Sequence, residues 1–108
     1  MDAGNIYSVE IIRYNIPAMV HTAFEEAYKK AGKFLEASPY CKSYQVIKGE
    51  DEPDNYIVTI NWTTIEDHLQ KFRNSEQFLS FFQLVKPFYN YIQEMKHYQP
   101  PLASWTRQ

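Results

Sequence analysis

The hydrophobic period changes part-way through residues 56–78, and this change limits the fold more than any other feature of the chain. Up to Trp62, β-branched and aromatic residues alternate with polar ones, which is typical of a strand. After Trp62, apolar side chains recur at helical spacing at Ile65, Leu69 and Phe72. A strand therefore turns directly into a helix, and we expect the Trp62 ring where sheet and helix meet, a common place for a small-molecule pocket.

Two helix starts are predicted in this stretch. Thr63 stands three residues before Glu66, as in a capping box, and Thr64 stands three residues before Asp67. Either threonine can cap the first helix. Ser75 is the expected start of a second helix.

The same reasoning along the chain gives the order strand, helix, strand, strand, helices, strand. This βαββαβ order predicts a ferredoxin-like α+β fold, with an antiparallel sheet and helices on one face. Pro17 marks the start of the first helix and Pro87 ends or kinks the last one. The predicted strands are residues 6–14, 40–48, 56–62 and 89–98, and the first helix runs to about residue 37.

The second face of this sheet is also expected to be covered. Val9 and Ile11 share one face of the first predicted strand, and Ile12 and Tyr14 share the other, so both faces are partly apolar. Aromatic residues make up 17% of the chain, more than one small core can surround. A two-fold copy of the sheet would cover the open face, which predicts a homodimeric α+β barrel.

Length and composition narrow the class of protein. The 108 residues predict a single domain, 1–108, with its core at about 6–98 and a tail, 99–108, that clasps the partner subunit. A net charge of −2 argues against a nucleic-acid partner. No apolar run reaches the length of a membrane span, and the N-terminus lacks the pattern of a signal peptide, so a cytoplasmic protein is expected. The single cysteine, Cys41, excludes an intrachain disulfide and a cysteine-based metal cage.

Several short runs along the chain form a recognisable set. The runs are Ile12-Arg-Tyr14, Phe24, Ala27-Tyr28, Ser38-Pro39, Trp62-Thr-Thr-Ile-Glu66, Phe72-Arg-Asn-Ser-Glu-Gln-Phe78 and Pro87-Phe88. Together they resemble the antibiotic biosynthesis monooxygenase domain family. The resemblance extends from about residue 7 to residue 98 and implies the dimeric ferredoxin-like barrel. Members of that family include cofactor-free oxygenases of quinols and anthrones, haem-degrading enzymes and proteins without known activity.

Departures from the family pattern bear on cofactors. Many relatives carry a histidine where this chain has Phe72, and the iron-binding histidine of haem-degrading members aligns with Phe82. An asparagine of those members falls near Ile12. The resemblance therefore implies no haem here, and we expect no cofactor. No metal is expected either, because the three histidines lie on three different elements without the spacing of metal ligands.

A cofactor-free oxygenase needs a dry aromatic site and a base that favours the phenolate of its substrate. Trp62 is the first candidate, since its N–H can orient a substrate oxygen, although it can equally be a core anchor. His97 and His68 are candidate bases. The alternatives are a histidine at the surface or dimer seam for His97 and a packing histidine for His68. Antiparallel pairing of the first strand with the third and fourth would group Trp62, Tyr7 and His97.

Further side chains are expected to bind the substrate. Arg13 can hold an oxyanion, or it can pair with Glu50, Asp51 or Asp54 near the acidic turn. The aromatic candidates can line the cleft, or they can pack in the core or the dimer interface. The candidate substrate-binding residues are Tyr7, Arg13, Tyr44, Phe72, Phe78, Phe82 and Tyr91.

The functional hypothesis is a cofactor-independent monooxygenase of a small aromatic substrate of the quinol or anthrone type. Two alternatives remain open: a non-catalytic small-molecule-binding module of the same fold, and a purely structural dimer domain. A cavity beside Trp62 with a histidine within hydrogen-bond reach would favour the enzyme. A cavity filled by Phe72, Phe78 and Phe82 would favour the binding module.

Overall fold

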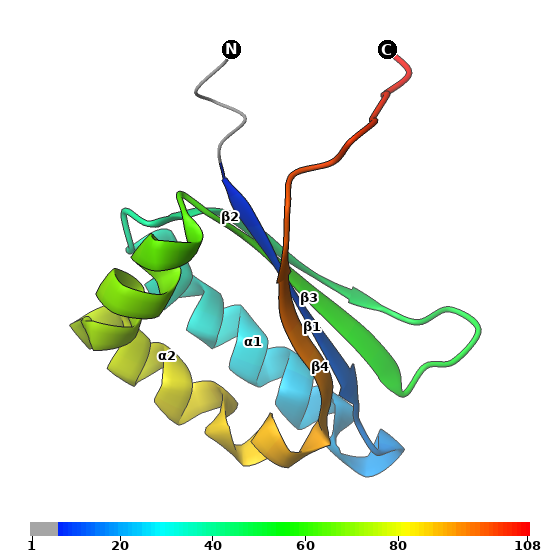
Figure 1. Cartoon of the computed structure of the whole chain (residues 1–108). Helices are drawn as coiled ribbons and strands as arrows, with labels where there is room; N and C mark the ends of the chain where they lie inside the picture. The colour runs from blue at the N-terminus through cyan, green and yellow to red at the C-terminus, as the bar shows by residue number, and fades with distance from the viewer. Residues whose placement is uncertain (1–6) are drawn as a thin grey trace.

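The computed structural model describes residues 7–108, in which a four-stranded antiparallel sheet carries its helices on one face (Figure 1). The strands stand side by side in the order β2-β3-β1-β4. The predicted βαββαβ order and the ferredoxin-like α+β fold are confirmed. The main elements are β1 (Ser8–Asn15), α1 (His21–Glu36), β2 (Cys41–Lys48), β3 (Asn55–Trp62), α2 (Glu76–Val85) and β4 (Ile92–Tyr98).

Strand β1 lies in the middle of the sheet, where its register brings distant parts of the chain together. It pairs with β3 on one side, so that Ser8 is opposite Trp62, and with β4 on the other, so that Glu10 is opposite His97. Because side chains alternate across a strand, Ser8 and Glu10 point to the same face. The pairing thus gathers Glu10, Trp62 and His97 at one end of the sheet.

The core lies between this face and the helices. Tyr14, Val58 and Trp62 of the sheet are at most 2% exposed, and they pack with Phe24 and Leu35 of α1. The rings of Tyr14 and Phe24 meet edge to face with centroids 4.8 Å apart. Aromatic packing of this kind adds to the free energy gained from burying apolar area.

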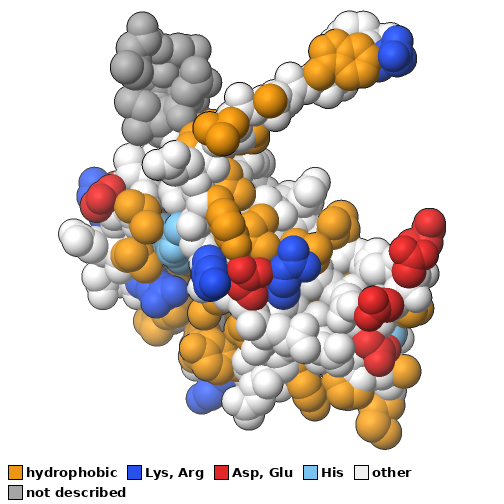
Figure 2. Space-filling view, turned by 45° about the vertical axis from the view of Figure 1, so that its right-hand side comes forward, with side chains coloured by type: hydrophobic (Ala, Val, Ile, Leu, Met, Phe, Trp, Pro, Cys, Tyr) orange, Lys and Arg blue, Asp and Glu red, His pale blue; other side chains and the backbone are white. Residues whose placement is uncertain are grey.

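The opposite face of the sheet is not covered within one chain. Val9, Ile11 and Ile57 are only half-buried there, and Arg13 is exposed. The tail after β4 extends away from the domain (Figures 1 and 2), with Leu102 98% and Trp105 73% exposed. A single chain shows neither a dimer nor a clasp, so both stay predictions. No helix within residues 7–108 is long and apolar enough to cross a membrane.

Two segments differ from the prediction. Residues 86–91 form a 3-10 helix instead of the beginning of the last strand, which starts at Ile92. Pro87 lies in the first turn of this helix, where its fixed φ favours helical geometry. As a result Tyr91 lies on the helix and not on a strand face. Residue 6, the predicted start of the first strand, lies outside the described residues.

The segment after Trp62 is an irregular helix. A π-helix covers Asp67–Lys71 and a 3-10 turn covers Phe72–Asn74. Of the two predicted caps it is Thr64 whose hydroxyl accepts the backbone N–H of Asp67, at 2.9 Å. Ser75 caps α2 as predicted, since its hydroxyl accepts the backbone N–H of Phe78.

Candidate functional site

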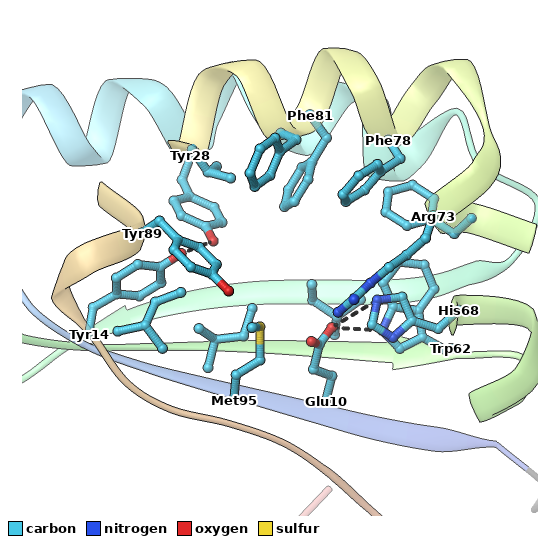
Figure 3. Close-up of a pocket in the computed structure, with 16 residues that line it drawn as sticks. Glu10, Tyr14, Tyr28, Trp62, His68, Arg73, Phe78, Phe81, Tyr89 and Met95 are labelled. Carbon is cyan, nitrogen blue, oxygen red and sulfur yellow. Dashed lines mark hydrogen bonds and ion pairs between the residues drawn. The ribbon is translucent and has the colours of Figure 1, made fainter. Parts of the chain in front are cut away.

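A cavity of about 310 Å³ lies between the sheet and α2 (Figure 3). Most of its wall is aromatic or aliphatic, with polar groups gathered at its two ends. Such a mixture, an apolar wall with few polar groups, is typical of small-molecule sites. The lining residues are Glu10, Ile12, Tyr14, Tyr28, Ile60, Trp62, His68, Phe72, Arg73, Phe78, Phe81, Phe82, Val85, Tyr89, Ile92 and Met95.

Glu10 is a carboxylic acid on the buried face of the central strand. It is 2% exposed, and the indole N–H of Trp62, itself 1% exposed, donates to its Oε1 at 3.0 Å. Burial raises the pKa of Glu10, and the Trp62 hydrogen bond and the Arg73 charge oppose that rise. A carboxyl group with a raised pKa can accept and release a proton nearer neutral pH than an exposed one.

His68 lies on the π-helix and joins this carboxyl group to a second histidine. Its ring stacks on Trp62, with centroids 4.2 Å apart and planes 4° from parallel. Its Nε2 is 3.7 Å from Oε1 of Glu10, and its Nδ1 is 2.7 Å from Nε2 of His97. Burial, with the charges of Arg73 and His97, lowers the pKa of His68 to about 3. His68 is therefore neutral near pH 7.

Arg73 brings a positive charge to the same end of the cavity. It comes from the 3-10 turn after the π-helix, and Figure 3 shows its side chain reaching toward Glu10 and His68. None of the ion pairs within residues 7–108 involves Arg73. A guanidinium that no carboxylate of the described chain holds is available to an anionic group of a ligand.

Tyrosine hydroxyls occupy the opposite end of the cavity (Figure 3). The hydroxyl groups of Tyr14 and Tyr28 lie 2.7 Å apart and share a hydrogen bond. Burial raises the pKa of Tyr14 to about 12, so this phenol stays protonated. One bond between two hydroxyl groups uses one of their two hydrogens. The other hydrogen can be donated to a ligand oxygen.

The residues at the acidic end also have the composition of a metal site. Within the described residues, Glu10, His68 and His97 form a group whose ligand atoms lie within 4.8 Å of one another. However, the His68 ring lies between the other two and turns a different nitrogen to each of them. One cation cannot use both nitrogens, and Arg73 adds a repelling charge. The geometry therefore fits a row of polar contacts that passes through the His68 ring better than a metal centre.

The predicted site residues divide into two groups. Trp62, His68, Phe72, Phe78 and Phe82 all line the cavity, and the phenylalanines border it without filling it. His97 does not line the cavity but is bonded to His68, which does.

The remaining four candidates lie elsewhere. Tyr7 lines a separate hollow at the end of the sheet. Arg13 is on the open face, where its Nε donates to Glu94 at 2.8 Å, and not to the acidic turn. Tyr44 packs over α1 and outside this cavity. Tyr91 does not line the cavity, because the 3-10 helix turns Tyr89 toward it instead.

Sequence reasoning missed Glu10 and Arg73. A signal for Glu10 was available, because it shares a strand face with Ile12 and Tyr14 and is the one charged residue on that face. A charge on an apolar strand face indicates a buried polar contact. Arg73 had no such signal, since its direction depends on the irregular turn that carries it.

Comparison with known proteins places the chain in a family. Residues 8–84 match the family model described as Antibiotic biosynthesis monooxygenase. The chain belongs to this family.

Individual relatives are distant. The uncharacterized protein YczJ of Bacillus subtilis is 26% identical over 76 residues, which is 70% of this chain and 80% of YczJ. A conserved protein from Methanosarcina mazei has a similar structure, with a TM-score of 0.74 at 15% identity, covering 92% of this chain and 97% of that one. SnoaB, a cofactor-independent oxygenase from Streptomyces nogalater, gives a TM-score of 0.67 at 13% identity, covering 95% and 99%. At these identities the structures show a shared fold.

Proposed function

We propose that this protein is a cofactor-independent monooxygenase of a small aromatic substrate of the quinol or anthrone type. The observation that carries the proposal is the buried Glu10 carboxyl group, held by the Trp62 N–H at the end of an aromatic cavity. Membership of the antibiotic biosynthesis monooxygenase family supports the reaction class. The cavity volume, about 310 Å³, suits a molecule of two or three fused rings.

In the proposed reaction Glu10 is the base. It removes the hydroxyl proton of the substrate, and the Arg73 guanidinium stabilises the resulting phenolate. The phenolate then gives one electron to O₂, and the substrate radical combines with superoxide to form a carbon-bound peroxide anion. The proton taken up by Glu10 returns to this anion and gives the hydroperoxide. Loss of water from the hydroperoxide leaves a carbonyl group, so that one oxygen atom enters the product and the other leaves as water. The aromatic wall limits the contact of the bound ring with solvent during these steps.

We also propose that the protein acts as a cytoplasmic homodimer. The half-buried Val9, Ile11 and Ile57 on the open sheet face would be covered by the same face of a second copy. The tail, 99–108, would then clasp the partner through Trp105. Light scattering on the purified protein tests the dimer, and removing residues 99–108 tests the tail. A monomer at micromolar concentration would contradict both.

A non-catalytic small-molecule-binding module is the second candidate function. One observation favours it: the pKa of His68 is about 3, so this histidine is a weak base and Glu10 is left as the base of the site. Phe72, at the position where many relatives carry a histidine, adds no base. A purely structural domain is less well supported, because the cavity is open between the sheet and α2.

Oxygen uptake decides between catalysis and binding. The purified protein is given dihydroxynaphthalenes and anthrones without flavin, metal or nicotinamide, beside the variants Trp62→Phe and Glu10→Gln. Tyr44→Phe is the control, because Tyr44 lies outside the cavity. Uptake that depends on the protein, persists in the control and falls in both site variants supports the proposal. Saturable binding of the same compounds without uptake above autoxidation supports the binding module instead.

A further inference from the structure

We propose that Glu10, His68 and His97 form a proton relay that connects the aromatic cavity with a second hollow at the end of the sheet. Its use in turnover rests on the proposed oxygenase function, while the relay itself is a property of the resting protein. The site contains a contact that it does not need for holding a ligand. A second histidine, outside the cavity, is bonded to the histidine within it.

The three groups follow one another from the interior to the surface. Glu10 is 2% exposed and His68 is 4% exposed, whereas His97 is only partly buried. The contacts are 3.7 Å from Glu10 Oε1 to His68 Nε2 and 2.7 Å from His68 Nδ1 to His97 Nε2. Each contact of His68 uses a different ring nitrogen. An imidazole that accepts a proton on one nitrogen can release one from the other.

The outer end of the relay opens into a hollow of about 310 Å³ that is distinct from the aromatic cavity. His97 lines this hollow beside Tyr7 and the exposed residues Tyr98 and Gln99. The aromatic cavity and this hollow have no lining residue in common. Among residues 7–108, the contact of His68 with His97 therefore joins the two spaces.

The chemistry of the proposed reaction gives the relay a purpose in both directions. When Glu10 has taken the substrate proton, it passes a proton to Nε2 of His68, while Nδ1 of His68 releases one to Nε2 of His97. His97 then releases a proton from Nδ1 to water in the hollow. Later, the peroxide anion needs a proton to become the hydroperoxide, and the reverse transfer supplies it. The return restores both tautomers, so no ring has to rotate and no net charge accumulates.

The neutral state of His68 suits this role. A ring that stayed protonated would hold the proton next to the Arg73 cation, whereas the low pKa of His68 favours transfer through the ring. The groups facing the relay are Arg73 and Trp62 at the inner end, and Tyr7, Glu66 and Tyr98 around the outer hollow. Arg73 is the cation of this set and lies at the inner end (Figure 3).

The variant His97→Gln separates a relay from a merely positioning contact. A glutamine amide can still hydrogen-bond to His68, but it cannot pass a proton on. We expect oxygen uptake to fall roughly tenfold or more with little change in KM, because a proton-transfer step is lost. Added imidazole, which can enter the outer hollow, restores part of the rate. His21→Gln, at a histidine bonded to Ile16 and Asp54 away from both spaces, leaves the rate unchanged. An unchanged rate in His97→Gln, or a loss that imidazole does not restore, overturns the relay.

A measurement without substrate keeps the relay testable if turnover is absent. Nitrogen-15 NMR of the resting protein reports which nitrogen of each histidine carries the hydrogen. The relay predicts that His68 carries its hydrogen on Nδ1 while Glu10 is protonated, and on Nε2 once Glu10 ionises. His97 should change in step with it, and Glu10→Gln should abolish the change in both. If the tautomers of His68 and His97 do not change when Glu10 ionises, the relay is overturned, even if oxygen uptake is found. Coupled tautomers without oxygen uptake support the relay and contradict the proposed function.

Discussion

The indole N–H of Trp62 donates to the carboxyl group of Glu10 at 3.0 Å, although the two residues are 52 positions apart in the chain. The bond forms because β1 and β3 are antiparallel neighbours, with Ser8 opposite Trp62. Both partners are buried, so neither can exchange the bond for one with water. This pair fixes the position of the carboxyl group at the end of the cavity.

Glu10→Gln should stabilise the protein at alkaline pH more than at acid pH. The folded state raises the pKa of Glu10, so the folded protein binds more protons than the unfolded chain once the pH exceeds 4.5. The free energy of unfolding therefore falls as pH rises from 4.5 through the folded pKa. In the variant, the amide oxygen of the new side chain would still accept from Trp62 and would carry no charge. Thermal melts at pH 4 and pH 8 test this, with the exposed Glu76→Gln as control. An equal effect of Glu10→Gln at both pH values would contradict the raised pKa.

His68→Gln should make the protein less sensitive to mild acid. The pKa of His68 is about 3 in the folded state, against about 6.5 in an unfolded chain. Between these values the unfolded chain binds the extra proton, so the free energy of unfolding falls as pH falls from about 6.5 toward 3. Urea titrations at pH 7 and pH 5 measure the loss in the wild type, which should be smaller in the variant. His21→Gln is the matched control.

Trp62→Phe should cost both stability and activity. The substitution removes the N–H that holds Glu10 and leaves a buried carboxyl group without this donor, at a cost of about 1–3 kcal/mol in the free energy of unfolding. Chemical denaturation measures this cost. Added to Glu10→Gln, Trp62→Phe should cost less than it does alone, because the amide is less costly to leave unpaired. Strictly additive effects would show that the two side chains are not coupled.

Arg73→Gln should weaken the binding of anionic ligands. Arg73 reaches the cavity and has no ion pair within the described residues, so its charge is free to meet a phenolate or carboxylate (Figure 3). We expect the Kd of 1-hydroxy-2-naphthoate to rise roughly tenfold, as for the loss of a charged hydrogen bond. Calorimetry measures the change, with the uncharged 1-naphthol as a ligand that should be affected little. Lys29→Gln removes a charge on exposed α1 and should leave both affinities intact.

Phe72→Ala should destabilise the fold far more than Phe82→Ala. Phe72 is 1% exposed and packs on Trp62 with ring centroids 4.7 Å apart, so its loss should cost about 3–5 kcal/mol. Phe82 is half-buried at the cavity wall beside Phe78, and truncating it should chiefly widen the cavity. Chemical denaturation of both variants measures the loss of stability, and binding of larger anthrones measures the widening of the cavity. A similar loss of stability in both variants would contradict this division.

The fold followed from the sequence because its hydrophobic periods are long and clear. Alternation in β3, and the stripe of Phe24 and Leu35 in α1, each determine one element and its buried face. The last strand was misplaced at its start, because Tyr89 and Tyr91 alternate like strand residues although Pro87 begins a 3-10 helix there. The proline therefore determined the local backbone structure, and the alternation of the tyrosines did not.

Only part of the candidate site could be predicted from the sequence. Trp62 and His68 could be placed, since one ends a strand and the other lies in the helix that follows. The 2.7 Å contact of His68 with His97 could not, because it depends on the register of β4 and on the wide turn of a π-helix. Arg13 was predicted either to hold an oxyanion in the cleft or to pair with the acidic turn, but its strand face is the open one, where Glu94 holds it.

Oxygen-18 labelling tests the central claim most directly. The wild-type protein is given an anthrone under ¹⁸O₂ in ordinary water, and the mass of the product is measured by mass spectrometry. The Glu10→Gln variant is assayed in parallel. A monooxygenase that uses Glu10 as its base predicts one ¹⁸O atom in the product, formed well above the autoxidation rate by the wild type and at close to that rate by the variant. Equal product formation with and without the wild-type protein, for every anthrone and dihydroxynaphthalene tried, would contradict the account.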